Sequence, residues 1–120
     1  MKALTEKEEA IMKIFWEKGP LFVKEIVEIL PEPKPHVNTV STFVRILEDK
    51  GYLTHEKLGT TYRYKPLLSE TDYGKKSLRN IMMRYFNNSL SNVVSALVKD
   101  EKITDQELRD LIDMVNKDNQ

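Results

Sequence analysis

The segment from Lys34 to Arg45 gathers small polar and basic side chains, which are the types that hydrogen-bond DNA. Asparagine can pair with adenine through two hydrogen bonds, serine and threonine can bond bases or phosphates, and arginine can reach guanine or phosphate. On a helix, polar residues three and four positions apart lie together, opposite the apolar ones. The sequence therefore predicts a DNA-reading surface made of Asn38, Thr39, Ser41, Thr42 and Arg45, preceded by Lys34 and His36. The alternative, a polar face that contacts only water, stays open.

A second group that can bind phosphates surrounds Gly59, a residue that lets the backbone approach an anion closely. Four side chains at or near this turn can contact phosphates: Lys57, Thr60, Thr61 and Arg63. Tyr62 and Tyr64 alternate with the arginine and are expected to pack on the helices, with stacking on bases as the alternative. Between residues 34 and 65, six lysines and arginines oppose three acids, in a chain whose net charge is zero. This excess is too small to predict DNA binding by itself.

The sequence contains no pattern of catalytic or metal-binding residues. It has no cysteine, which excludes thiolate zinc sites, iron–sulfur clusters and a cysteine nucleophile. His36 and His55 lack companion ligands at metal-binding spacing, and neither a glycine-rich phosphate loop nor a nucleophile–base pair is recognisable. We therefore expect a protein that is not an enzyme and that holds no metal and no small-molecule cofactor.

Three helices and a hairpin are predicted to position these groups. Thr5 and Glu8 form a capping-box pattern before the first helix, and Gly51 follows the third helix where a C-terminal glycine belongs. The expected helices run from Thr5 to Gly19, from Val23 to Leu30 and from Val37 to Lys50, and the expected strands cover residues 52–56 and 61–65. This order fits a mainly α fold, the winged helix-turn-helix, in which the second helix of the motif enters the major groove. The hairpin is the wing of this fold, and Trp16 is expected in the core or beneath the wing.

The remainder of the chain, residues 68–120, predicts a separate helical module after a winged-helix domain of residues 1–67. Helices are expected over residues 70–87, from about residue 90 onward, and after a second capping box at Thr104 and Glu107. Their apolar surface exceeds what such a short module can bury within itself, so a second copy of the chain is the favoured partner. The expected dimer contacts are Leu78, Ile81, Met82, Tyr85, Phe86, Val94, Leu97, Leu108, Leu111 and Ile112. Packing against the first module is the alternative.

Composition sets wider limits on the class of protein. With 120 residues, 40% hydrophobic and 32% charged, the chain can form a packed core and is not a disordered polycation. No apolar run is long enough to span a bilayer, and the first residues contain no apolar signal segment. A cytoplasmic protein is expected. A winged-helix module that binds another protein and never touches DNA is the rival function.

Several segments, in this order and spacing, resemble the penicillinase-repressor family of winged-helix transcriptional repressors (BlaI/MecI/CopY type). They are residues 9–20 (EAIMKIFWEKGP), 23–26 (VKEI), 38–42 (NTVST) with 45–47, 50–53 (KGYL) and 62–64 (YRY) followed by Pro66 and Leu67. The resemblance covers nearly the whole chain and is closest in the first 67 residues. Pro35 stands where the family often has a tryptophan.

The resemblance implies a homodimeric repressor on a palindromic operator in double-stranded DNA, with the C-terminal helices as the dimer module. It also implies control of genes of the β-lactam resistance type. In such members a membrane sensor-protease detects the drug, and the repressor is cut in the dimer module between Asn and Phe. The corresponding bond here is Ala96–Leu97, and neither residue matches the pair. The copper-responsive branch uses cysteine pairs, which this chain lacks.

Overall fold

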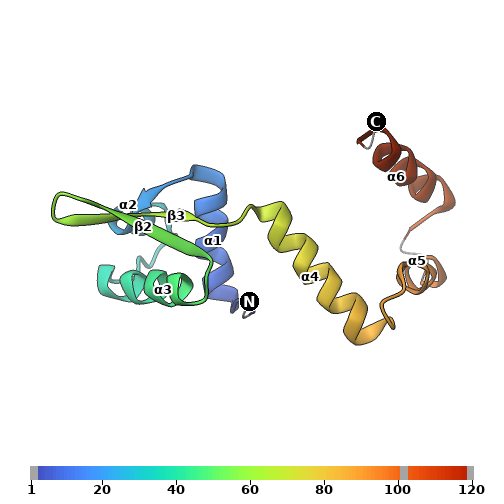
Figure 1. Ribbon diagram of the computed structural model, residues 1–120, viewed down its shortest axis with the longest axis horizontal. Coiled ribbons are helices and arrows are strands. Elements are labelled where there is room, and N and C mark those ends of the chain that lie inside the picture. The colour runs from blue at the N-terminus through green and yellow to red at the C-terminus, as the bar shows by residue number, and fades with distance from the viewer. Residues whose placement is uncertain (1–2, 101–102, 119–120) are drawn as a thin grey trace. The chain divides into compact units, whose positions relative to one another are not determined.

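The computed structural model describes residues 3–100 and 103–118, and it divides the chain into two compact units, residues 1–74 and 75–120. Helices and strands of the first unit are α1 (Glu6–Lys18), β1 (Leu21–Phe22), α2 (Val23–Ile29), α3 (Val37–Asp49), β2 (Leu53–Leu58) and β3 (Thr61–Pro66). The helices α4 (Glu70–Tyr85), α5 (Leu90–Lys99) and α6 (Asp105–Asp118) follow. Figure 1 shows α1 to α3 beside the β2–β3 hairpin, whose tip projects beyond them. The predicted winged helix-turn-helix is confirmed.

The start of α1 follows the predicted capping box. The Thr5 hydroxyl accepts the Glu8 N–H at 3.2 Å, and the Glu8 carboxylate accepts the Thr5 N–H at 2.8 Å. This arrangement satisfies two backbone donors that a bare helix end leaves unpaired. The helix then places Met12 and Phe15, both fully buried, into the core beside Ile26 of α2.

Helix α3 presents one apolar face to that core. Val40, Val44 and Leu47 are buried, while Phe43 packs against the core from a half-buried position. The helix ends at Asp49, and Gly51 follows with a φ of +91°. Residues with a side chain rarely adopt this value, so the predicted role of the glycine is confirmed. Burial of the apolar face fixes which side of α3 faces solvent.

The hairpin is part of a three-stranded antiparallel sheet with the order β1-β3-β2. The short extended segment at residues 21–22 pairs with β3, an arrangement that the sequence pattern does not specify. In the hairpin His55 is opposite Tyr64, and Glu56 is opposite Arg63. Directly opposed residues share a face of the sheet, so His55 and Tyr64 face one side, and Glu56 and Arg63 face the other.

Trp16 lies at the edge of the core, where β3 leads into α4. Its indole N–H donates to the Leu68 carbonyl at 3.0 Å, and its ring stacks on Tyr73 at a centroid distance of 5.4 Å. The first turn of α4 therefore packs with α1, which explains why the first unit extends to Gly74 and not only to residue 67. Sequence patterns locate the start of α4 correctly, but the stacking involves residues far apart in the chain.

The second unit is helical, as expected. Ser89 caps α5 by accepting the Asn92 N–H at 3.2 Å, and Thr104 caps α6 by accepting the Glu107 N–H at 3.1 Å. In α6 the structure describes side chains only as far as Asp110, together with that of Asp113. Among the helices of the described ranges, none is both long and apolar enough to cross a membrane.

Candidate nucleic-acid interface

The outward face of α3 carries most of the residues predicted to read DNA. Asn38, Thr39, Thr42 and Arg45 are exposed, and Ser41 is half-buried. The Thr42 hydroxyl donates to the backbone carbonyl of Asn38 at 3.0 Å, and the backbone N–H of Asn38 donates to His36. Among the described residues, no hydrogen bond involves the side-chain amide of Asn38. A side-chain amide on the first turn of an exposed helix can form the paired hydrogen bonds that identify adenine.

Two residues ahead of α3 have structural roles that the sequence analysis missed. His36 is the N-cap, and its ring Nδ1 accepts the Asn38 N–H at 3.0 Å. The Lys34 ammonium donates to three carbonyls at the end of α2, those of Val27, Glu28 and Leu30, at 2.8–3.3 Å. Lysine is favourable there because the carbonyl end of a helix carries partial negative charge. Lys34 therefore caps α2, and its contact with DNA stays a prediction.

A groove of about 610 Å³ lies between α3, β3 and the start of α2. Ser41 and Arg45 line it from α3, and Tyr62 and Tyr64 line it from the hairpin. Tyr64 packs on the helices as expected, but Tyr62 is 46% exposed, so the expectation for that residue is wrong. Burial, together with the negative charge of Glu48, raises the pKa of Tyr64, whose phenol stays neutral and able to donate a hydrogen bond. The polar face of α3 and the wing thus form one concave surface.

The residues expected to contact phosphates from the wing are divided between its two faces. Lys57 and Thr60 are exposed at the tip, and Thr61 is exposed and donates to the Leu58 carbonyl at 3.1 Å. Gly59 adopts a φ of +65°, which suits the tight turn. Arg63 lies on the face opposite Tyr62 and Tyr64, and the structure does not bring it together with α3.

Arg63 is paired with Glu56, a contact that the sequence analysis missed. The arginine donates through Nε at 2.9 Å and through a second guanidinium nitrogen to the same carboxylate oxygen. The pair carries no net charge, so Arg63 presents less positive potential to a phosphate than its residue type suggests. The predicted strands, 52–56 and 61–65, would place 56 opposite 61. In the structure β2 continues to Leu58, which shortens the turn to two residues and places Glu56 opposite Arg63.

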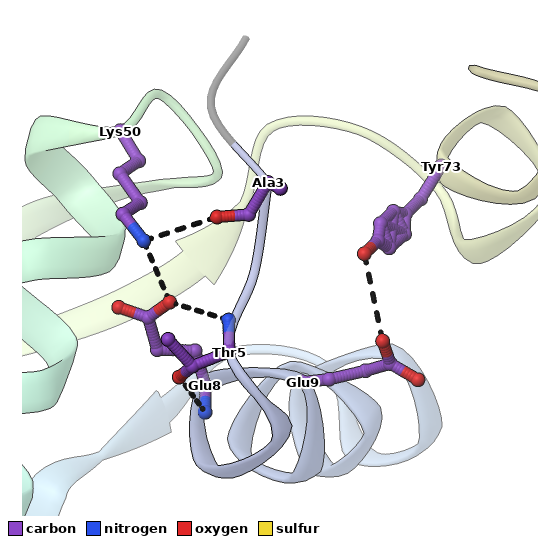
Figure 2. A network of polar contacts seen from close by, with 6 residues as sticks. All are labelled: Ala3, Thr5, Glu8, Glu9, Lys50 and Tyr73. Carbon is purple, nitrogen blue, oxygen red and sulfur yellow. Dashed lines mark hydrogen bonds and ion pairs between the residues drawn. The ribbon is translucent and has the colours of Figure 1, made fainter. Parts of the chain in front are cut away.

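A buried ion pair holds the end of α3 to α1 (Figure 2). The Lys50 ammonium lies 2.7 Å from Glu8 Oε1 and donates to the Ala3 carbonyl at 3.1 Å. The Glu8 side chain is only 4% exposed. Burial alone would raise the pKa of Glu8, but the bonds and charge of Lys50 and the bonds from Thr5 outweigh it and lower this pKa. The pair joins residues 42 positions apart, which local sequence patterns do not predict.

The exposed apolar side chains of α4 and α5 are a second candidate surface. No side chain of these two helices is buried, and the exposed fractions of Leu78, Ile81, Tyr85 and Leu97 range from 45% to 68%. Met82, Phe86, Val94 and Leu108 are half-buried. The side chains of Leu111 and Ile112 lie outside the described part of the chain. Soluble proteins seldom expose so many large apolar residues unless a partner covers them.

The bond between Ala96 and Leu97 lies inside α5, which runs from Leu90 to Lys99. Ala96 is half-buried, and its carbonyl accepts the Asp100 N–H at 3.2 Å at the end of the helix. Cleavage at this bond would require α5 to open locally.

Comparison with known proteins places these features in a family. The sequence profile of the penicillinase repressor family matches residues 4–117. The penicillinase repressor of Bacillus licheniformis is 23% identical over 115 residues, which cover 95% of this chain and 90% of that protein. The methicillin resistance regulatory protein MecI of Staphylococcus aureus (strain N315) is 24% identical over 95% of this chain and 94% of its own length. The solution structure of the DNA-binding domain of the repressor BlaI has a TM-score of 0.52 at 28% identity, covering 61% of this chain and 94% of the domain.

Proposed function

The chain belongs to the penicillinase repressor family, and we propose from this membership and from the geometry of α3 that it represses transcription by occupying an operator in double-stranded DNA. One observation carries the proposal. The polar residues of α3 lie exposed beside the wing, on a helix whose other face is fixed in the core. In this geometry the N-terminal turns of α3 enter the major groove and the wing follows the adjacent backbone.

The apolar surface of α4 and α5 supports a homodimer on a palindromic operator. Two copies related by a two-fold axis bury the same surface on each other and present two α3 helices to two half-sites. Occupancy of both half-sites raises affinity from the micromolar range of non-specific binding to the order of 10⁻⁸ M. Loss of the dimer module therefore releases the promoter.

The named relatives suggest which genes are controlled. Two of them are called a penicillinase repressor and a methicillin resistance regulatory protein, so we propose regulated genes of the β-lactam resistance type. A membrane sensor-protease that cuts the dimer module is the proposed partner for induction. The Ala96–Leu97 bond is helical and differs from the Asn–Phe pair that is cut in the family. Cleavage at another bond of the dimer module would relieve repression in the same way.

Salt dependence of DNA binding tests the function. If a dimer neutralises about six to ten phosphates, its affinity for duplex DNA falls about 10³- to 10⁵-fold between 50 and 200 mM salt. Gel-shift titrations with random duplex DNA and with promoter fragments from the host measure this slope. A module that binds only proteins gives no salt-sensitive retardation, and that result would reject the proposal in favour of the rival function.

Asn38→Ala is expected to relax the base preference at one position of each half-site. The alanine removes the paired hydrogen bonds to adenine, which costs about 1–3 kcal/mol of discrimination. Selection from a random duplex library, carried out with the wild type and the variant, measures the preferred sequence of each. Asp49→Ala, at the exposed C-terminal end of the same helix and outside the predicted DNA-reading surface, is the matched control. An unchanged preferred sequence in Asn38→Ala contradicts the base contact.

Arg63→Ala is expected to weaken binding to all DNA sequences alike and to flatten the salt slope. Removal of the arginine also leaves the Glu56 carboxylate unpaired on the wing, where it repels phosphates. Glu56→Gln, which frees the arginine, should have the opposite effect. Titrations of both variants with random duplex DNA at two salt concentrations compare them. If the two variants bind DNA with equal affinity, Arg63 does not contribute to the DNA interface.

A further inference from the structure

A polar link joins the wing to the last turns of α3. His55 of β2 places Nδ1 2.6 Å from Oε2 of Glu48 in α3. The exposed fractions of these side chains are 36% and 28%, so the contact lies at the edge of the core and within reach of solvent. Between α3 and the projecting hairpin, the described residues form no other side-chain ion pair. The wing is held on α3 by this polar contact together with the packing of Leu53 and Tyr64 in the core.

Two aromatic rings fix the position of the imidazole. The centroid of the His55 ring is 4.6 Å from that of Tyr62 and 5.4 Å from that of Tyr64. The same two tyrosines line the groove that Ser41 and Arg45 border from α3. His55 thus lies on the α3 side of the hairpin, beside the surface proposed to meet DNA.

The protonation state of His55 determines the net charge between α3 and the wing. Glu48 faces the imidazole from α3, the two tyrosines face it from β3, and Glu56 and Lys57 lie beside it on β2. Arg45 of α3 acts on the neighbouring Tyr64 and borders the same groove. Glu56 is paired with Arg63 on the other face of the hairpin. With a neutral imidazole, the Glu48–His55 pair carries one negative charge between α3 and the wing. With a protonated imidazole, the pair is neutral and the ion pair is complete.

Duplex DNA brings phosphates close to both elements, so binding favours the form that carries less negative charge. We propose that His55 is a positioning residue that holds the wing on α3 through Glu48, and that the chain binds DNA with this imidazole protonated. DNA binding then favours the protonated form, so the affinity for DNA should be higher at pH 6 than at pH 8. This inference rests on the proposed function, because it concerns how the same surface accepts DNA.

His36, the other histidine of the chain, provides the matched control. Its Nδ1 accepts a backbone N–H at the start of α3, a role that requires an unprotonated nitrogen. His36→Asn keeps a capping side chain and removes the imidazole. Because His36 is itself predicted to contact DNA, the variant is compared through the ratio of its affinities at pH 6 and pH 8, and not through the affinity itself. That ratio isolates the contribution of His55 to the pH dependence.

Fluorescence anisotropy with a labelled random-sequence duplex of about 30 base pairs, long enough for two half-sites, tests the proposal at constant ionic strength. The wild type and His36→Asn should bind about three- to tenfold tighter at pH 6 than at pH 8. His55→Gln should lose most of this dependence. His55→Lys, which keeps a cation opposite Glu48 at every pH, should bind at pH 8 as tightly as the wild type binds at pH 6. Circular dichroism confirms that each variant is folded.

The possible failures are distinguishable. If the duplex binds but His55→Gln keeps the pH dependence of the wild type, His55 is not the linked group and the inference is wrong, while the repressor function stands. If His36→Asn abolishes the dependence, the linked proton belongs to His36 and the inference is again wrong. If the duplex does not bind at any pH or salt concentration, the proposed function fails, and the inference fails with it.

Discussion

Lys50→Met is expected to lower the free energy of unfolding by about 3 kcal/mol at pH 7, because removing one partner of a buried ion pair leaves the other charge uncompensated. The Glu8 carboxylate is 4% exposed, and without the ammonium it keeps only its bonds from Thr5. Methionine retains most of the volume of the lysine stem, so the loss reports the charge and not a cavity. Urea unfolding, followed by circular dichroism, measures the change.

The pH dependence of this loss identifies its cause. In the wild type the pKa of Glu8 is lowered, so its contribution to stability is present above the ordinary glutamate pKa and is lost as pH falls through the lowered value. In Lys50→Met the desolvation of the carboxyl group dominates and raises the pKa of Glu8. Protonation then relieves the buried charge, so the difference between wild type and variant should narrow as pH falls from about 7 to about 4.

Two further variants complete this test. Glu8→Gln/Lys50→Met should recover much of the lost stability at pH 7, because it contains no unpaired charge. Lys13→Met removes the partner of Glu70, which lies 3.0 Å away, and both of these side chains are more than half exposed. That control should leave the unfolding free energy nearly unchanged. An equal loss at both pH values in Lys50→Met would contradict the buried-charge explanation.

Features with a local cause could be predicted from the sequence. The capping box at Thr5 and Glu8, the burial of Val40, Val44 and Leu47 on one side of α3, and the turn at Gly59 all depend on residues within a few positions of one another. Helix capping, helical periodicity and the demand of a tight turn for positive φ act over that range. These features were sufficient to predict the order of the elements and the polar face of α3.

Features that depend on pairs distant in the chain could not be predicted in this way. The pairing of β1 with β3, the capping of α2 by Lys34, and the links from α3 to Glu8 and His55 require the assembled fold. Several of these contacts show that a candidate residue has a structural role that its residue type does not reveal. Lys34, for example, has the charge of a phosphate ligand, yet its ammonium is surrounded by the carbonyls of a helix end. Residue type alone does not distinguish these roles.

Ile81→Asp is expected to convert the proposed dimer into monomers and to lower the affinity for a palindromic operator by about 100-fold or more. The isoleucine is 46% exposed on α4, so an aspartate there meets water in a single chain and costs the monomer little. In a dimer interface the same carboxylate would be buried without a partner, which is strongly unfavourable. Loss of the dimer removes the second α3 helix and with it the second half-site.

Sedimentation velocity, carried out at micromolar concentration, and gel shifts with operator DNA obtained by selection measure the two parts of this prediction. Asn80→Asp adds the same charge at the preceding position of α4, about 100° around the helix, and should keep both the dimer and the affinity. Ile81→Asp should keep a micromolar, salt-sensitive affinity for DNA, because each winged helix is unchanged and still neutralises phosphates.

If Ile81→Asp remains dimeric, α4 is not part of the dimer interface. A variant that becomes monomeric yet binds the operator as tightly as the wild type would show that a single copy of α3 and its wing carries the recognition. The two measurements together therefore separate the role of the apolar surface from that of the polar face of α3.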